Sequence, residues 1–158
     1  MASVKGVEVT NMDATPVVKV DAELAGGEMK VFHGTFEASS LGSGSDITIA
    51  RIPANATIHD VILKCDALGG SVTLKVGDAD DDDRYIAATS TWNVAGQTQS
   101  MLAGSSTGAA IAAMTGVGHR TTASTDILIT TGGASATGTI KCWAVSYTHL
   151  TLPTSYPV

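Results

Sequence analysis

Glycine and proline break the chain into short runs of strand-forming residues, and this pattern restricts it to β structure. The clearest run is 71–76, in which Val72, Leu74 and Val76 alternate with polar residues, the two-residue period of a half-buried strand. Runs with related patterns occupy residues 29–37, 46–52, 57–65, 126–130 and 139–144. Because no strand–helix–strand period accompanies them, the sequence predicts an all-β, antiparallel β-sandwich or jelly-roll-like single domain.

One of these runs carries apolar residues in both strand phases. In the run 57–65, Val61 and Leu63 fall in one phase, while Ile58 and Ile62 fall in the other. Successive side chains of a strand point to opposite faces. We therefore expect both faces of this strand to be covered, which indicates a central position in its sheet.

Two cysteines and one tryptophan are predicted to belong to the core. Cys65 and Cys142 each fall in the inward phase of a strand. The N-terminus has no continuous apolar signal-peptide segment, which favours a reducing compartment and two buried free thiols over a disulfide. Trp92 is expected to fill one end of the core, the alternative being an anchor for a partner.

The 158 residues suffice for one domain, flanked by two segments of different character. Residues 1–28 hold two short β-prone runs and are predicted to form an extended N-terminal arm that lies on a neighbouring subunit. Residues 29–144 are predicted to form the β-sandwich domain, and residues 145–158 an artefactual tail. Inside the domain, residues 103–118 are almost all small and are predicted to form a long loop.

The tail prediction depends on the segment VSYTHLTLPT at residues 145–154. It resembles the translation of a transposase-type sequencing adapter, as expected of a metagenomic gene assembled from environmental reads. The alternative is a genuine final strand followed by a proline-containing end. On the adapter interpretation the natural sequence is known only to Trp143, and His149 has no functional role.

The composition excludes two classes of partner. A net charge of −6 argues against nucleic-acid binding, which needs a basic face. No run approaches the roughly 18 consecutive apolar residues of a membrane-spanning helix. The sequence therefore predicts a soluble, acidic protein that binds neither nucleic acid nor membrane.

An acidic cluster is the one candidate for metal binding. Asp78, Asp80 and Asp82 match the first ligand positions of a calcium-binding EF-hand loop, but Asp83 stands where that loop needs glycine and Thr89 where it needs glutamate. The favoured interpretation is a solvated turn that Arg84 partly neutralises. The alternative is a calcium site of another kind, with Asp78, Asp80 and Asp82 as its ligands and calcium as the only cofactor.

No pattern predicts catalysis. The four histidines, at positions 33, 59, 119 and 149, share no metal-ligand spacing. Ser106 is central in a G-x-S-x-G match at residues 104–108, but such a nucleophile needs a preceding strand and a following helix. A hydrolase would also need Ser106 to meet a histidine and an acid. We therefore expect no catalytic residues, no enzyme and no bound cofactor.

The stretch from Arg51 to Thr89 resembles the small virion structural proteins of tailed bacteriophages, and the likeness extends over about residues 29–144. The resemblance is carried by Ile52-Pro53-Ala54-Asn55-Ala56, Ile58, Asp60-Val61, Leu63, Asp66, Leu68, Thr73-Leu74, Val76-Gly77-Asp78 and residues 81–86. It implies a capsid decoration or minor head protein that assembles in the host cytoplasm and resides in the virion.

The same resemblance implies binding rather than turnover. The expected partners are the major capsid protein or other virion proteins, together with further copies of this chain in a homo-oligomer. The arm at 1–28 and the loop at 103–118 are the predicted interfaces. The alternative is a tail or fibre protein with a receptor- or carbohydrate-binding role, in which the acidic loop holds calcium.

The adapter interpretation makes a prediction about the gene. A gene amplified from its source should depart from the printed sequence after residue 144, because the codons beyond that point would not belong to it. Sequencing across the 3′ end checks this. Natural codons for VSYTHLTLPT in the source genome would show that the tail is genuine.

Overall fold

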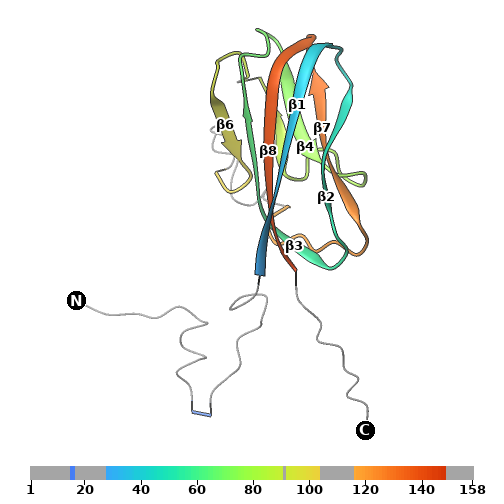
Figure 1. Ribbon diagram of the computed structural model, residues 1–158, viewed down its shortest axis with the longest axis vertical. Helices are drawn as coiled ribbons and strands as arrows, with labels where there is room; N and C mark the ends of the chain where they lie inside the picture. Colours follow the sequence, from blue (N-terminus) through green and yellow to red (C-terminus); the bar gives the residue numbers. More distant parts are fainter. Residues whose placement is uncertain (1–14, 17–27, 91, 104–115, 149–158) are drawn as a thin grey trace, which may run out of the picture.

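Eight strands build two four-stranded antiparallel sheets in the computed structural model, which describes residues 15–16, 28–90, 92–103 and 116–148 (Figure 1). The strands are β1 (Glu28–Leu41), β2 (Asp46–Ile52), β3 (Ala56–Cys65), β4 (Thr73–Gly77), β5 (Ile86–Thr89), β6 (Gln97–Ser100), β7 (Thr125–Gly132) and β8 (Ala136–Thr148). Among the described residues, no helix has the length and apolar character needed to span a bilayer.

The strand pairs are nested along the chain. One sheet has the order β1-β8-β3-β6 and the other the order β2-β7-β4-β5. The first strand thus pairs with the last, the second with the seventh, the third with the sixth and the fourth with the fifth. This arrangement is a long antiparallel hairpin rolled into two sheets. It confirms the predicted all-β sandwich and is consistent with a jelly roll.

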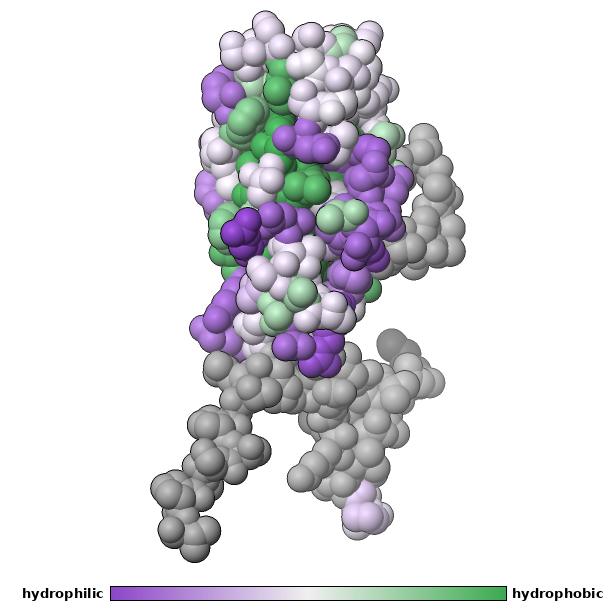
Figure 2. Space-filling model, turned by 90° about the vertical axis from the view of Figure 1, so that its right-hand side faces the viewer, coloured by the Kyte–Doolittle hydropathy of each residue, from purple (hydrophilic) through white to green (hydrophobic). Residues whose placement is uncertain are grey.

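The core lies between the sheets and consists mainly of aliphatic side chains. Figure 2 views the molecule from one side and shows apolar residues in a vertical strip in its upper half, with hydrophilic residues beside it. Full burial of these side chains supplies the main driving force for folding. The largest fully buried side chains are Trp92, Ile52, Ile58, Leu63, Leu74, Ile127, Ile129, Ile140, Val61, Val72, Val76 and Thr121.

A β-bulge explains the two apolar phases of β3. The register with β8 shifts between Ile58 and Asp60, so that one extra residue changes which side chains face inward. Ile58 and Val61 are therefore both fully buried, whereas Ile62 is only half-buried on the outer face. β3 lies between β8 and β6, as expected of a central strand. The prediction that both of its faces are covered was wrong, because beyond the bulge the outer face holds the half-buried Ile62 and the exposed Lys64.

A similar bulge shapes β2. Its register with β7 shifts between Thr48 and Ala50. The extra residue turns both Ile49 and Ala50 into the core together with Ile47 and Ile52. The bulge therefore explains why apolar and polar residues alternate imperfectly in this run of the sequence.

Strand β6 has no signal in the sequence, because all four of its residues are polar. It pairs with the C-terminal part of β3, from Ile62↔Ser100 to Cys65↔Gln97. Beside it, the Asp60 carboxylate accepts hydrogen bonds from the Ser100 hydroxyl (2.8 Å) and from the backbone N–H of Leu102 (3.3 Å). Polar contacts therefore fix this strand, and apolar periodicity could not reveal it.

The predicted core residues are in place. Cys65 and Cys142 are buried free thiols, and Trp92 is completely buried. Burial raises the pKa of the Cys65 thiol to about 11 and that of Cys142 to about 12. Both cysteines thus remain protonated at neutral pH and are poor nucleophiles.

Strand β8 continues through Thr148 and so includes four residues of the predicted tail. Val145–Thr148 pair with β1 on one side, and with Ala56–Asp60 of β3 on the other. Backbone groups make these pairs, so the pairing does not tell where the residues came from. The adapter origin of residues 145–154 stays a prediction.

A close approach of the two sheets at Gly34 gives a stability test. A Cβ atom added to Gly34 of β1 would lie 2.3 Å from the backbone oxygen of Ile49 in β2. We expect Gly34→Ala to lower the free energy of unfolding by about 1–3 kcal/mol, because a backbone has to move. Urea denaturation measures this. Gly42→Ala is the matched control, since no atom lies within 4 Å of its added Cβ; equal stability of the two variants would contradict the close approach.

Candidate functional site

The start of β1, the end of β8 and the turn before β3 meet at one end of the sandwich, which we call the arm end. Here Glu28 opens β1 directly beside Thr148 at the close of β8 (Figure 1). The turn at 53–56 adjoins them, because Ala56 pairs with Thr148. Of the two segments predicted to be interfaces, 1–28 and 103–118, residues 1–14, 17–27 and 104–115 lie outside the described residues.

The turn between β2 and β3 is held to the strand-like segment before β7 by Thr121. This buried hydroxyl donates to the backbone oxygen of Pro53 (2.7 Å) and accepts from the backbone N–H of Ala56 (3.0 Å). Asn55 has a positive φ of 60°, a conformation that asparagine tolerates better than most residues. The Pro-Ala-Asn-Ala sequence thus encodes a rigid corner of the arm end.

The acidic loop is organised around a buried carboxylate. Asp78 is only 3% exposed. Its Oδ2 accepts hydrogen bonds from Arg84 Nε and from the Tyr85 hydroxyl, both at 2.8 Å. Its Oδ1 accepts from the backbone N–H groups of Asp80 and Asp81 at 3.1 Å. Asp78 therefore folds the loop onto the sandwich, and its lone pairs are largely occupied by partners within the protein.

These contacts also set the ionisation of the loop. Burial of Asp78 opposes its charge, but the hydrogen bonds from Tyr85 and Arg84 outweigh burial and lower its pKa. Burial and the bond to Asp78 together raise the pKa of Tyr85. Asp78 is thus a carboxylate and Tyr85 a neutral phenol throughout the neutral range.

The three carboxylates that the structure brings together share only Asp82 with the predicted calcium ligands. Oxygens of Asp81, Asp82 and Asp83 lie within 4.8 Å of one another. A hydrogen bond with Asp81 raises the pKa of Asp83, and Lys75 of β4 pairs with Asp82. The structure does not gather Asp78, Asp80 and Asp82 as one group. Calcium binding by the loop stays a prediction.

The remaining chemical candidates do not assemble. The His33 ring stacks on Trp143 with centroids 4.9 Å apart, and the His59 ring meets the edge of Tyr147. In the described part of the chain, no histidine belongs to a group of three potential metal ligands. Ser106 and the G-x-S-x-G match at 104–108 lie outside the described residues.

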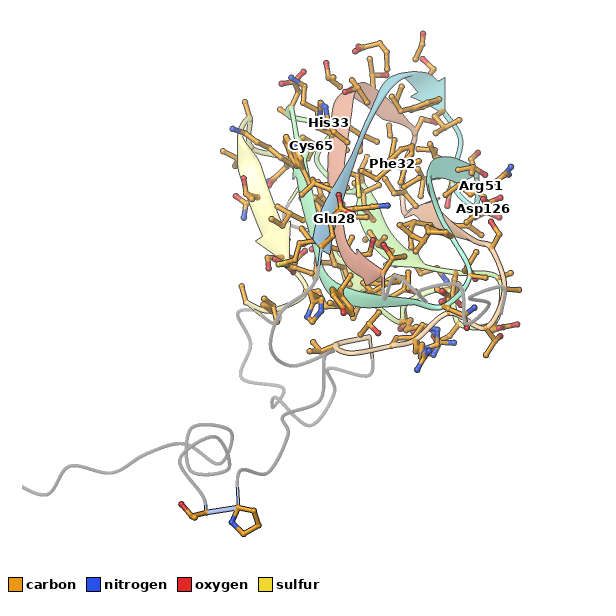
Figure 3. All side chains as sticks on the ribbon, turned by 60° about the horizontal axis from the view of Figure 1, so that its bottom comes forward. Glu28, Phe32, His33, Arg51, Cys65 and Asp126 are labelled. Atoms are coloured by element: carbon orange, nitrogen blue, oxygen red, sulfur yellow. The ribbon has the colours of Figure 1, made fainter. Side chains whose placement is uncertain are left out.

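A surface that the sequence did not reveal lies on the first six residues of β1. Glu28–His33 are exposed on both strand faces, and Figure 3 labels Glu28, Phe32 and His33 along this part of the strand. Met29, Val31 and Phe32 are 60%, 61% and 44% exposed. Alternation predicted a strand here, but only the sheet order shows that it is an edge strand whose start projects beyond the core.

Comparison with solved structures relates this fold to bacteriophage capsids. One match is a chain of the cyanophage Pam1 capsid asymmetric unit, with a TM-score of 0.61 and 23% identity over 79% of this chain and 88% of that one. A chain of the Ralstonia phage GP4 capsid gives 0.57 and 18% identity over 79% and 87% of the two chains. A chain of the Helicobacter pylori bacteriophage KHP30 acid-stable capsid gives 0.55 and 8% over 75% and 86%.

No protein-family model matches the chain, and no curated protein sequence matches it. At these low identities the structural likeness establishes the fold alone. Each match covers most of both chains, so the matched chains are similar in size to this one. The chain therefore has the fold of small chains found in three phage capsid structures.

The buried carboxylate gives a prediction about acid stability. Since the pKa of Asp78 lies below its unfolded value of about 3.9, its charge stabilises the fold above that pH, and this contribution is lost as the pH falls through the folded pKa. Asp78→Asn should lower the free energy of unfolding by about 1–3 kcal/mol at pH 7. Between about pH 5 and pH 3, a range that includes the unfolded pKa of Asp, the free energy of unfolding of the variant should fall less than that of the wild type.

Urea denaturation across that pH range checks the prediction. Asp80→Asn is the matched control, since the backbone N–H of Asp80 donates to Asp78, whereas its own carboxylate has no hydrogen bond or ion pair among the described residues. The control should follow the wild type at every pH. An Asp78→Asn variant as acid-sensitive as the wild type would contradict the assigned role.

Proposed function

We propose that this chain is a structural component of a bacteriophage virion, bound to the capsid shell as a decoration or minor head protein. The observation that carries the proposal is its likeness to chains of three phage capsid structures, over at least three quarters of its length in each case. A tail or fibre protein with a receptor-binding role is less well supported, because all three matches come from capsids.

The size of the matched chains favours an added protein over a shell-forming one. The match covers 86–88% of each of them, so little of each chain remains outside the shared fold. A small, closed sandwich suits a protein that adds contacts to an existing shell. Such binding stabilises the assembled state by mass action, because it favours the particle over its free subunits.

The arm end is the proposed contact with the shell. It brings together the start of β1, the end of β8 and the rigid corner held by Thr121. A segment that binds a neighbour in extended form needs a fixed point of departure, and paired strands provide one. The proposed partner is the major capsid protein, with binding and no catalysis as the whole activity, and with assembly in the host cytoplasm.

Co-expression with the major capsid protein of the same genome tests the function. The chain should sediment with assembled shells at a fixed ratio to the shell protein and should raise the temperature at which the shells disassemble. A chain that stays in the supernatant while shells form would refute capsid binding.

The arm is tested in the same assay. Deletion of residues 1–27 should abolish co-sedimentation and leave the melting temperature of the domain unchanged, since the sandwich begins at Glu28. Removal of residues 149–158 is the control and should leave shell binding intact, because those residues are predicted to be foreign. Unchanged binding after the arm deletion would show that other residues make the contact.

A further inference from the structure

The start of β1 is an exposed, apolar sheet edge. β1 is the outermost strand of its sheet and bonds only to β8 there. Its residues Glu28–His33 are all exposed, and their register with β8 is regular. They include three of the six exposed large hydrophobic residues of the described chain. Such an edge offers unpaired backbone groups and apolar side chains to another strand.

The other sheet edges of the described chain are protected. β6 is a strand of four polar residues, and β5 is equally short with an irregular register. β2 is interrupted by its bulge. Short, polar or bulged edges are the usual means by which proteins prevent edge pairing. The start of β1 is neither short nor bulged, and it exposes three large apolar side chains beside the charged Glu28 and Lys30, so we infer that another strand covers it.

The part of β1 that is open on both faces has defined limits. It begins at Glu28, where β1 begins, and it ends at Gly34, where the backbone of β2 packs over one face of β1. The midpoint of this stretch is Val31. Two identical strands that pair antiparallel around a two-fold axis overlap over the whole stretch only when the axis passes through its midpoint.

We propose that β1 of one copy pairs with β1 of a second copy around a two-fold axis at Val31. The two Val31 side chains then face each other. Met29 of each copy lies opposite His33 of the other, next to the ring stack that His33 makes with Trp143. Lys30 of each copy lies opposite Phe32 of the other, so that its stem and ammonium group cover the aromatic ring.

Other registers satisfy fewer of these groups. An axis at Lys30 places two ammonium groups directly opposite each other, which is destabilising. An axis at Met29 pairs Glu28 with Lys30 of the other copy, but sets Val31 and Phe32 opposite Gly27 and Gly26 and leaves them uncovered. An axis between two residues brings inward-facing side chains against outward-facing ones. Of these axes, only the one at Val31 sets all three apolar residues opposite side chains without bringing two like charges together.

The pairing joins the two β1 sheets into one continuous sheet across the axis. It concerns two copies of this chain away from any particle, so it holds or fails independently of the proposed capsid function. Its isologous geometry closes at two copies and leaves no further β1 edge free.

Charged variants at the axis provide the test. Val31→Asp and Val31→Lys should each be monomeric in sedimentation velocity, with dimer dissociation constants raised at least about tenfold, because two like charges would meet. An equimolar mixture of the two variants should dimerise again, since an aspartate then faces a lysine. Val94→Asp is the matched control: Val94 is 58% exposed but lies away from β1, and this variant should dimerise like the wild type.

Cysteine cross-linking tests the register. Val31→Cys should form a disulfide-linked dimer on mild oxidation, whereas Met29→Cys should not, and the two native thiols are buried. A wild-type chain that stays monomeric up to its solubility limit would overturn the proposal. So would a mixture of Val31→Asp and Val31→Lys that fails to dimerise, or cross-linking at Met29 in place of Val31.

Discussion

The antiparallel pairing of the first strand with the last is the interaction on which the rest of the structure depends. β8 lies between β1 and β3 and bonds to both along nearly its whole length. Without it, β1 would have no partner in its sheet, and β3 would keep only the four-residue β6. Because these partners are distant in sequence, the sheet closes only after most of the chain has been placed, a topology that favours slow, highly cooperative folding.

The sequence was informative about strands and less so about their partners. Alternation located most strands, since inward and outward side chains follow from the pleat alone. It did not predict the bulges of β2 and β3, because a bulge exists only relative to the neighbouring strand that it faces. It also missed β6, whose residues are polar and whose position depends on hydrogen bonds to Asp60 and on the backbone of β3.

The same limit applies to the surfaces. The acidic cluster was visible in the sequence, and Arg84 was correctly identified as a cation that partly neutralises it. The burial of Asp78 could not be predicted from the sequence, because it depends on the packing of Tyr85, whose hydroxyl donates a hydrogen bond to the Asp78 carboxylate. Similarly, Met29 and Val31 have the pattern of core residues. They are exposed because their phase of β1 is the outer face of the sheet, whereas Gly34 in the other phase faces β2 and Ala38 is buried.

The central position of β8 also constrains which residues can stand at the C-terminal end of that strand. Positions 145–148 are flanked by β1 and β3. Each backbone N–H there lies next to a strand to which it can donate a hydrogen bond, so proline, which has no N–H, is excluded. Position 146 points inward and is buried, which demands a small side chain. If the residues after Ala144 are foreign, as the adapter interpretation predicts, the gene's own residues must meet the same conditions for β8 to pair with β1 and β3 in this way.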